Sequence, residues 1–337
     1  MLIHKQTNIF NDDIAYVEQH DFSQANLNEG NRLLAITTVA SICYQNPKAI
    51  GSESLYNRLL AESHGLPSSS FEMVPVLFDM YYLSSFLREK GVKKEDTNIF
   101  KYGEKIEIGN YLLTNFRAVI YDFENLNIDL RHIFNTPEEC EIIKQHFKVF
   151  KFHVDFPTRS QMVRHRVNWQ ELSRRYVSGE RVPFEFYISD KMKNVKQTLW
   201  IPIDDNTQTS QDVSTEDLID VCIRHYKQAL EQGVKPQEAR RIIPQAAYST
   251  IWGAFQPTQL ANFFKLRDDS HAQWEIQQTA KAMKYCIQVE RCKDILTPER
   301  EATILARMEA HERGEIDFLT AEELDAIILQ KQLEENS

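Results

Sequence analysis

The sequence predicts an α/β fold in which helices and strands alternate along the chain. Residues 31–44 and 53–63 carry apolar side chains at helical spacing. Residues 150–156 instead alternate apolar and polar side chains with period two, which indicates a half-buried strand. Only 10 of the 337 residues are glycine, and the chain has no low-complexity segment or convincing internal repeat. A chain of this length forms one large domain or two smaller ones.

A break separates the second predicted helix from the strand. Residues 64–70 read His-Gly-Leu-Pro-Ser-Ser-Ser, and such a run of glycine, proline and serine favours a loop. A loop of this kind is able to hold a ligand.

The predicted strand leads into a short helix. Pro157 is expected to end the strand, because proline lacks the backbone donor that a central strand needs. Thr158 and Gln161 then have capping-box spacing. The helix that they begin would carry Gln161 and Arg164 on one face, three residues apart.

Further helices are expected downstream. Ser214 or Thr215 begins an amphipathic helix that Gly233 ends, and Pro236 begins another that ends before Pro244.

The C-terminal part is expected to be helical throughout. Residues 260–286 have the pattern of one long helix. Helix starts at Thr297 and Thr320 predict a charged, helical extension over residues 291–337, in which we recognise no chemistry.

The composition argues against several classes of protein. A net charge of −10 disfavours bulk binding of nucleic acid, which needs a broad basic surface. The five cysteines show no Cys-x-x-Cys spacing, so we expect reduced thiols and no metal site. No apolar run is long enough to span a membrane and no secretion signal is recognisable, so a cytoplasmic location is expected.

An unusual density of arginine marks the predicted site of function. Residues 159–181 contain six arginines and two glutamates, within an acidic chain. Guanidinium groups bind phosphate and carboxylate oxygens through two parallel hydrogen bonds and stay charged at physiological pH. The segment therefore predicts an anionic small-molecule ligand.

Three sequence blocks, in order, resemble the flavin-dependent thymidylate synthase family. The first is the loop from His64 to Glu72, similar to the flavin loop of that family. The second block is Gln161-x-x-Arg-His-Arg followed by Glu171-x-Ser-x-Arg-Tyr, and the third is the segment 262–276 with Leu-Arg-x-x-Ser-His-Ala-Gln-Trp-Glu-Ile. Together the blocks span roughly residues 30–290.

The resemblance implies a reaction and its ligands. Such enzymes methylate deoxyuridylate (dUMP) at C5 to give thymidylate (dTMP), with flavin adenine dinucleotide (FAD) as cofactor and methylenetetrahydrofolate and NADPH as co-substrates. Nucleotide and folate would thus be the partners, with no nucleic acid and no membrane. The hydride comes from the reduced flavin, and no cysteine nucleophile is expected.

The resemblance also implies a role for each matching residue. The expected catalytic residues are Ser173, Arg175 and Gln277. The expected substrate-binding residues are Gln161, Arg164, Glu171, Ser173, Arg174, Arg175 and Tyr176, with Arg175 on the nucleotide phosphate. The expected flavin-binding residues are His64, Ser69, Arg164, His165, Arg166, Arg267 and His271.

The chain departs from the family pattern at several positions. Six residues separate Arg166 from Ser173, one fewer than in the family signature. Gln277 and Thr250 stand where many members have arginine, and Gln256-Pro-Thr replaces Asn-x-Arg before the third block. These changes leave two alternatives open: a related flavin enzyme that methylates or hydroxymethylates another pyrimidine nucleotide, and a non-catalytic nucleotide or RNA binder.

The resemblance finally implies an architecture. A mixed β-sheet flanked by helices is expected in a catalytic domain over residues 1–290, with an insertion at about 80–145 and the helical extension over 291–337. Family members are homotetramers whose sites are built from several subunits, so a homotetramer is expected.

Overall fold

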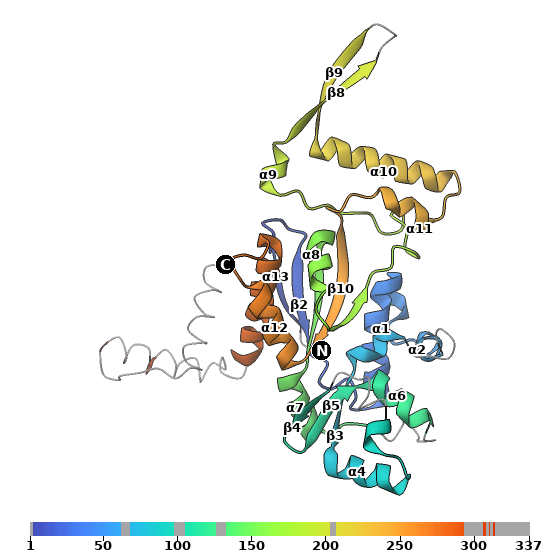
Figure 1. Ribbon diagram of the computed structural model, residues 1–337, viewed down its shortest axis with the longest axis vertical. Helices are drawn as coiled ribbons and strands as arrows, with labels where there is room; N and C mark the ends of the chain where they lie inside the picture. The colour runs from blue at the N-terminus through green and yellow to red at the C-terminus, as the bar shows by residue number, and fades with distance from the viewer. Residues whose placement is uncertain are drawn as a thin grey trace. The chain divides into compact units, whose positions relative to one another are not determined.

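A computed structural model describes residues 3–61, 68–97, 105–125, 133–202 and 207–292, together with residues 306, 307, 310 and 313. The chain divides into two compact units, residues 1–20 with 263–337 and residues 21–262 (Figure 1). Both units contain helices and strands, which confirms an α/β chain. The expected domain boundary at residue 290 stays a prediction, and the expected helices from Thr297 and Thr320 lie outside the described residues.

The first unit combines a hairpin and a long helix. Strands β1 (Ile3–Thr7) and β2 (Tyr16–His20) pair antiparallel, and helix α13 (Trp274–Cys292) packs against both of them. The ring of Trp274 lies 6.3 Å from that of Phe10. Gln19 donates to Glu290 at 2.8 Å, so polar and apolar contacts both hold the helix to the hairpin.

Three antiparallel strands form the centre of the second unit. Strand β10 (Tyr248–Phe255) lies between β6 (Lys148–Asp155) and β7 (Asn168–Glu171) and is buried along its whole length. Gly253 is required on β10, because a Cβ atom there would lie 2.5 Å from the ring of Trp169. The strand predicted at 150–156 is confirmed as β6, which begins two residues earlier and ends one residue earlier.

The two N-terminal helices of this unit are confirmed. Helix α1 (Glu29–Tyr44) begins at Asn28, whose side chain accepts from the amide of Asn31 at 2.8 Å. Helix α2 (Glu53–Leu60) is capped in the same way by Ser52. Both caps satisfy amides that a helix leaves unpaired at its first turn.

The predicted insertion forms a small antiparallel sheet together with the strand that directly precedes it. Strand β5 (Tyr111–Asn115) pairs antiparallel with β3 (Pro75–Asp79) and with β4 (Ile106–Ile108). The helices of this region are α4 (Met80–Glu89), α6 (Phe116–Asn125) and α7 (Pro137–His146), and its short 3₁₀ helices are η2 (Ser69–Met73) and η3 (Lys94–Asp96). Their apolar side chains share one buried cluster with α1 and α2, so the insertion is packed into the unit.

The start of helix α8 (Phe156–Met162) corrects a prediction. Its N-cap is Asp155, whose carboxylate accepts from the amide of Thr158 at 3.2 Å, and Pro157 lies inside the first turn. Proline fits there because its missing N–H would have no helical partner. The helix ends at Met162, so Arg164 lies in the following turn and does not share a helix face with Gln161.

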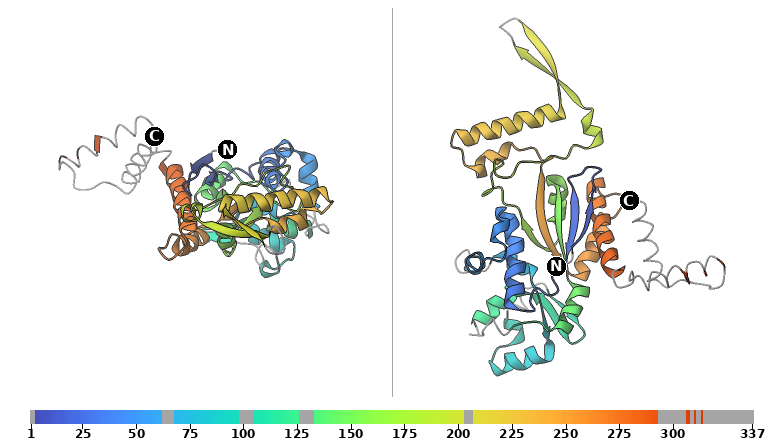
Figure 2. Two further views of the ribbon diagram at one scale, coloured as in Figure 1. Left: turned by 90° about the horizontal axis from the view of Figure 1, so that it is seen from above. Right: turned by 180° about the vertical axis from the view of Figure 1, so that it is seen from behind.

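A hairpin and a helix extend from this unit, with β8 (Lys196–Pro202) and β9 (Gln208–Ser214) projecting beyond α10 (Thr215–Glu231) (Figures 1 and 2). Helix α10 begins at a capping box on Ser214, and Gly233 adopts φ +85° two residues after its end, as predicted. The short helices are η1 (Pro47–Ala49), α9 (Asp190–Lys193), α11 (Pro236–Ala239) and η5 (Arg240–Ile242).

The single helix predicted over residues 260–286 is wrong. Two helices occupy this region, α12 (Pro257–Arg267) and α13, and residues 268–273 separate them. Asp269 accepts from the backbone and ring of His271, which stabilises a turn in place of helix. Aspartate and serine at 268–270 compete for backbone donors and favour such a turn.

Candidate functional site

The arginine segment runs from α8 through a turn into β7 and then into a second turn. Arg164 and Arg166 are exposed in the first turn, and their guanidinium groups have no ion-pair partner among the described residues. His165 between them is buried, and its carbonyl accepts from Trp169 Nε1 at 3.2 Å. The turn thus presents two free cations on a backbone that is anchored to the sheet.

The second turn, which follows β7, carries Ser173 and Arg175 in different environments. The amide of Ser173 donates to the carbonyl of Cys43 at 3.2 Å, and its own carbonyl accepts from Tyr176 at 3.1 Å. Arg175 is exposed, with its guanidinium 5.3 Å from the ring centre of Tyr176. The ring of Tyr176 lies 5.9 Å from that of Tyr44. Arg175 is therefore available to a ligand from solvent.

Arg174, by contrast, is buried to 7% exposure. It donates to the carbonyls of Val182 and Pro183 at 2.6 and 3.4 Å, and its guanidinium lies 4.2 Å above the ring of Phe184. Burial lowers the pKa of Arg174 from its ordinary value. The side chain thus holds the segment 182–184 while remaining a buried cation.

A cavity of about 450 Å³ opens beside Arg174. Its polar wall consists of Arg159, Glu171, Arg174, Arg240, Arg241 and Ser249, and its apolar wall of Phe156, Leu172, Phe184 and Ile243. Arg240 and Arg241 are exposed at its edge. Four guanidinium groups against one carboxylate make this cavity suited to an anion.

Three buried donors in that wall lack a hydrogen-bond partner within the described part of the chain. They are Arg159 Nε, Arg174 Nε and Ser249 Oγ. A buried donor without a partner loses about 1–3 kcal/mol of solvation, so native proteins rarely retain one unless a ligand, ion or water satisfies it. Each of these three groups belongs to a residue that lines the same cavity, so we take this cavity as the candidate binding site.

Glu171 is already engaged in this wall. Its carboxylate forms an ion pair with Arg159, which reaches it from α8. The ion pair leaves Arg159 Nε without a partner among the described residues and ties α8 to Glu171, the last residue of β7. Of the predicted substrate-binding residues, Glu171 and Arg174 therefore share the cavity.

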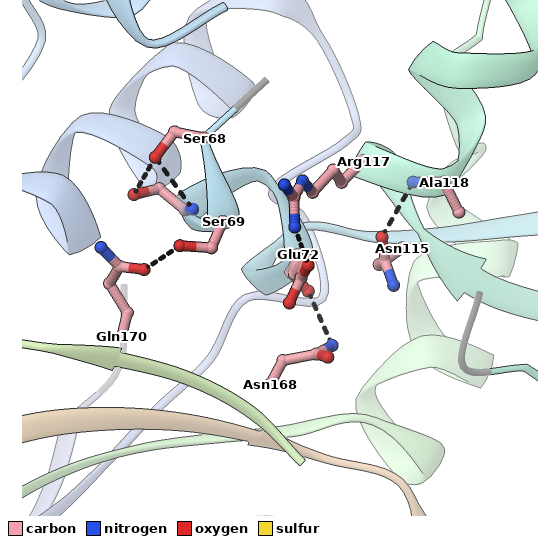
Figure 3. A network of polar contacts seen from close by, with 9 residues as sticks. Ser68, Ser69, Glu72, Asn115, Arg117, Ala118, Asn168 and Gln170 are labelled. Atoms are coloured by element: carbon pink, nitrogen blue, oxygen red, sulfur yellow. Dashed lines mark hydrogen bonds and ion pairs between the residues drawn. The ribbon is translucent and has the colours of Figure 1, made fainter. Parts of the chain in front are cut away.

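A polar network connects the first sequence block to β7 (Figure 3). Ser69 Oγ donates to Gln170 Oε1 at 2.5 Å, and Asn168 Nδ2 donates to the carbonyl of Glu72 at 3.4 Å. The carboxylate of Glu72 forms an ion pair with Arg117. Ser69 thus lies beside the second block, whereas His64 lies outside the described residues.

A cluster of polar and aromatic side chains surrounds His153 on the neighbouring strands. His153 Nδ1 is 2.8 Å from Thr250 Oγ1, and Nε2 is 3.1 Å from a carboxylate oxygen of Glu185. The ring stacks on Tyr248 with centroids 5.1 Å apart. Burial lowers the pKa of His153 from its ordinary value. Thr250 is thus used in a contact between β6 and β10.

Three further predicted site residues, Arg267, His271 and Gln277, belong to the other unit. His271 is 94% exposed and bonds Asp269. Gln277 Nε2 donates to the carbonyl of Ala272 at 2.7 Å. Arg267 is half-buried at the end of α12.

Sequence reasoning did not assign Arg159, Arg240, Arg241 or Ser249 to the site. Arg159 was counted among the six arginines, and the adjacent pair Arg240-Arg241 is a visible basic signal. A lone serine at 249 carries no signal, since its burial in the cavity wall depends on how β10 pairs with its neighbours.

Two of the described thiols, Cys140 and Cys286, are buried and not activated as nucleophiles. Burial raises the pKa of Cys140 to about 11 and that of Cys286 to about 12. Cys43 accepts from Gln170 Nε2 at 2.8 Å. A nucleophilic cysteine requires a lowered pKa, and these two thiols stay protonated at neutral pH.

Two features are absent from the part of the chain that the structure describes. No group of three or more histidine, cysteine or acidic side chains there is placed to hold a metal ion. None of the helices found there has the length and apolar character needed to cross a membrane.

The arginine-lined cavity suits an anionic ligand, and comparisons with known proteins indicate which family the chain resembles. Residues 141–290 match the family model described as thymidylate synthase complementing protein. A flavin-dependent thymidylate synthase of Thermosipho africanus is 39% identical over 140 residues, covering 39% of this chain and 60% of the relative. One from Wolbachia pipientis is 32% identical over 169 residues, covering 46% and 54%.

Residues 141–290 are therefore similar to the thymidylate synthase complementing protein family, which confirms the resemblance drawn from the motifs. The match spans only about 54–60% of the length of these relatives. The match to the family model begins at residue 141, near the end of the predicted insertion, so residues before 141 stand outside it.

Proposed function

We propose that this protein is a flavin-dependent thymidylate synthase, which methylates dUMP at C5 with methylenetetrahydrofolate, FAD and NADPH. The observation that carries the proposal is the arginine-lined cavity with three unpartnered buried donors, located within the family-matched region. A nucleoside monophosphate supplies the oxygen acceptors that this wall lacks.

In this proposal the nucleotide phosphate lies in the cavity. Arg174 Nε, Arg159 Nε and Ser249 Oγ point donors to it, and Arg240 and Arg241 close the open edge. Arg175 approaches the same phosphate from the exposed turn, directly after Arg174. Fixed donors hold the pyrimidine in one orientation, which lowers the entropic part of the barrier to carbon transfer.

The residues present also fit a flavin dinucleotide. The guanidinium groups of Arg164 and Arg166 have no ion-pair partner among the described residues, and they match the two negative charges of its diphosphate. Ser69, in the first sequence block, donates its own proton to Gln170 and offers its hydroxyl lone pairs to the cofactor. We assign His64, His165, Arg267 and His271 to the same cofactor by resemblance. When bound, the reduced flavin supplies the hydride that completes the methyl group.

The remaining substrate contacts are also part of the proposal. Gln161, Glu171 and Tyr176 bind the nucleotide, Ser173 lies beside the pyrimidine, and Gln277 replaces an arginine of other members. Glutamine both donates and accepts hydrogen bonds at a pyrimidine edge, although it carries no charge.

A homotetramer completes the proposal, since members of the family build their sites from several subunits. Exposed apolar side chains on β8, on α10 and directly before β8 support self-association. Trp200 is 68% exposed, Val221 is 51% and Val195 is 47%. Clusters of exposed apolar side chains mark interaction surfaces in soluble proteins. Light scattering of the purified protein tests the tetramer.

Two measurements test the catalytic proposal. Addition of FAD to the purified protein should produce a bound flavin spectrum, and the reduced enzyme should convert dUMP to a product heavier by one methylene group. A hydroxymethyl product, or activity on deoxycytidylate in place of dUMP, would identify the sister enzyme. Absence of flavin binding at excess cofactor contradicts both enzymatic functions and leaves the non-catalytic binder.

A further inference from the structure

The predicted insertion contributes one charged side chain to the flavin loop. Arg117, the second residue of α6, forms an ion pair with Glu72, the last residue of the first sequence block (Figure 3). Both side chains are half-buried, with 28% and 22% exposure. Arg117 lies outside the family-matched residues 141–290, so the match assigns it no role.

The placement of Arg117 is rigid. Asn115 Oδ1 accepts from the amide of Ala118 at 3.0 Å and caps the first turn of α6 (Figure 3). The preceding residue, Phe116, stacks on Phe71 with centroids 6.0 Å apart and planes at 21°. Consecutive residues of η2 and α6 therefore pair twice, first ring on ring and then carboxylate on guanidinium.

The same short segment is attached to β7 on its other side. Ser69 donates to Gln170, and the carbonyl of Glu72 accepts from Asn168. Strand β7 continues into Glu171 and Leu172 of the cavity wall. Segment 69–73 thus connects the insertion to the candidate site, and the ion pair fixes its far end.

We infer that Arg117 is a positioning residue for the flavin: through Glu72 it holds Ser69 and its 3₁₀ helix in the geometry that binds the cofactor. The inference rests on the proposed function. A carboxylate that loses this partner keeps its charge in a half-buried place, so it must turn to solvent or disturb its neighbours. Either movement displaces the segment that carries Ser69.

The test measures FAD binding by quenching of flavin fluorescence. We expect Arg117→Ala to weaken FAD binding about tenfold, a typical coupling between sites, while dUMP affinity stays within about twofold. Arg117→Lys should recover most of the loss, because the ammonium retains the charge opposite Glu72. The matched control is Arg88→Ala on α4, an exposed arginine of the same insertion that contacts Ser85 at 3.4 Å.

A double-mutant cycle separates positioning from general support. If Arg117 acts through Glu72, the pair Arg117→Ala with Glu72→Ala binds FAD no more weakly than Glu72→Ala by itself. The inference would be overturned if folded Arg117→Ala lost FAD affinity and dUMP affinity to the same extent and also melted at a lower temperature. Unchanged FAD binding would overturn it as well. Failure of the parent protein to bind FAD instead refutes the proposed function, and the inference with it, before any variant is compared.

Discussion

Replacing Arg174 by methionine tests the cavity most directly. The side chain is almost fully buried and has three separate contacts: the carbonyls of Val182 and Pro183, and the ring of Phe184. Methionine retains most of the volume and removes every donor. The change therefore separates what the cation does from what the packing does.

The magnitude for stability follows from these contacts. The short bond to Val182 is charge-assisted and worth about 1.5–3 kcal/mol, while the 3.4 Å contact to Pro183 adds little. A desolvated guanidinium over an aromatic ring adds roughly 0.5–2 kcal/mol. Desolvation, which lowers the pKa of Arg174, offsets part of this sum. We expect a net loss of about 2–4 kcal/mol and a melting temperature lower by roughly 5–12 °C.

The same change should weaken nucleotide binding. Loss of the Nε–H donor to the phosphate removes about 1.5–3 kcal/mol, or roughly 10- to 150-fold in affinity. Isothermal titration with dUMP, well below the melting temperature, measures this in the folded variant. Arg224→Ala, on the exposed face of α10, is the control and should alter neither quantity.

Two outcomes would refute this reasoning. A variant that melts like the parent shows that Arg174 does not hold segment 182–184. A variant that is destabilised yet binds dUMP like the parent shows that the phosphate does not lie in this cavity.

The remaining predictions concern other residues. Arg175→Ala should weaken dUMP binding by about 1.5–3 kcal/mol and leave the melting temperature nearly unchanged, because this side chain is exposed; unchanged titration curves would contradict it. Arg175→Lys should rescue only part of that loss, since an ammonium cannot bind two oxygens in parallel. Serine or alanine at all five cysteines should leave methyl transfer measurable in variants shown to be folded, whereas loss of activity there would revive a thiol mechanism. The lowered pKa of His153 means that the unfolded chain binds a proton first as pH falls, so stability should decrease on acidification below about pH 6.5 and less so in His153→Gln; identical melting-temperature profiles from pH 7 to 5 would contradict this.

Local patterns in the sequence were sufficient for several elements of the fold. Helices α1 and α10 agree with their predicted spans because capping side chains and apolar spacing act within a few residues. Competing local signals explain the two errors. Asp155 replaced Thr158 as the cap of α8, and the turn at Asp269 divided a helix whose pattern looked continuous.

The sequence by itself also predicts the chemical class of the ligand. A high density of arginine in an acidic chain predicts an anionic ligand whatever the fold, because the charge follows from the composition. The order of the motifs indicated a resemblance to a known family, and the comparison over residues 141–290 confirmed that resemblance.

Only the tertiary structure decided which arginines share a cavity. Arg174 and Arg175 are adjacent in sequence, yet the first is buried against Phe184 and the second is exposed. Arg240 joins the wall from a segment more than sixty residues away. Likewise, the ion pair of Arg117 with Glu72 depends on how the insertion packs on η2. Contacts of this kind arise from long-range packing, in which burial and partner choice are set by the fold and leave no local pattern in the sequence.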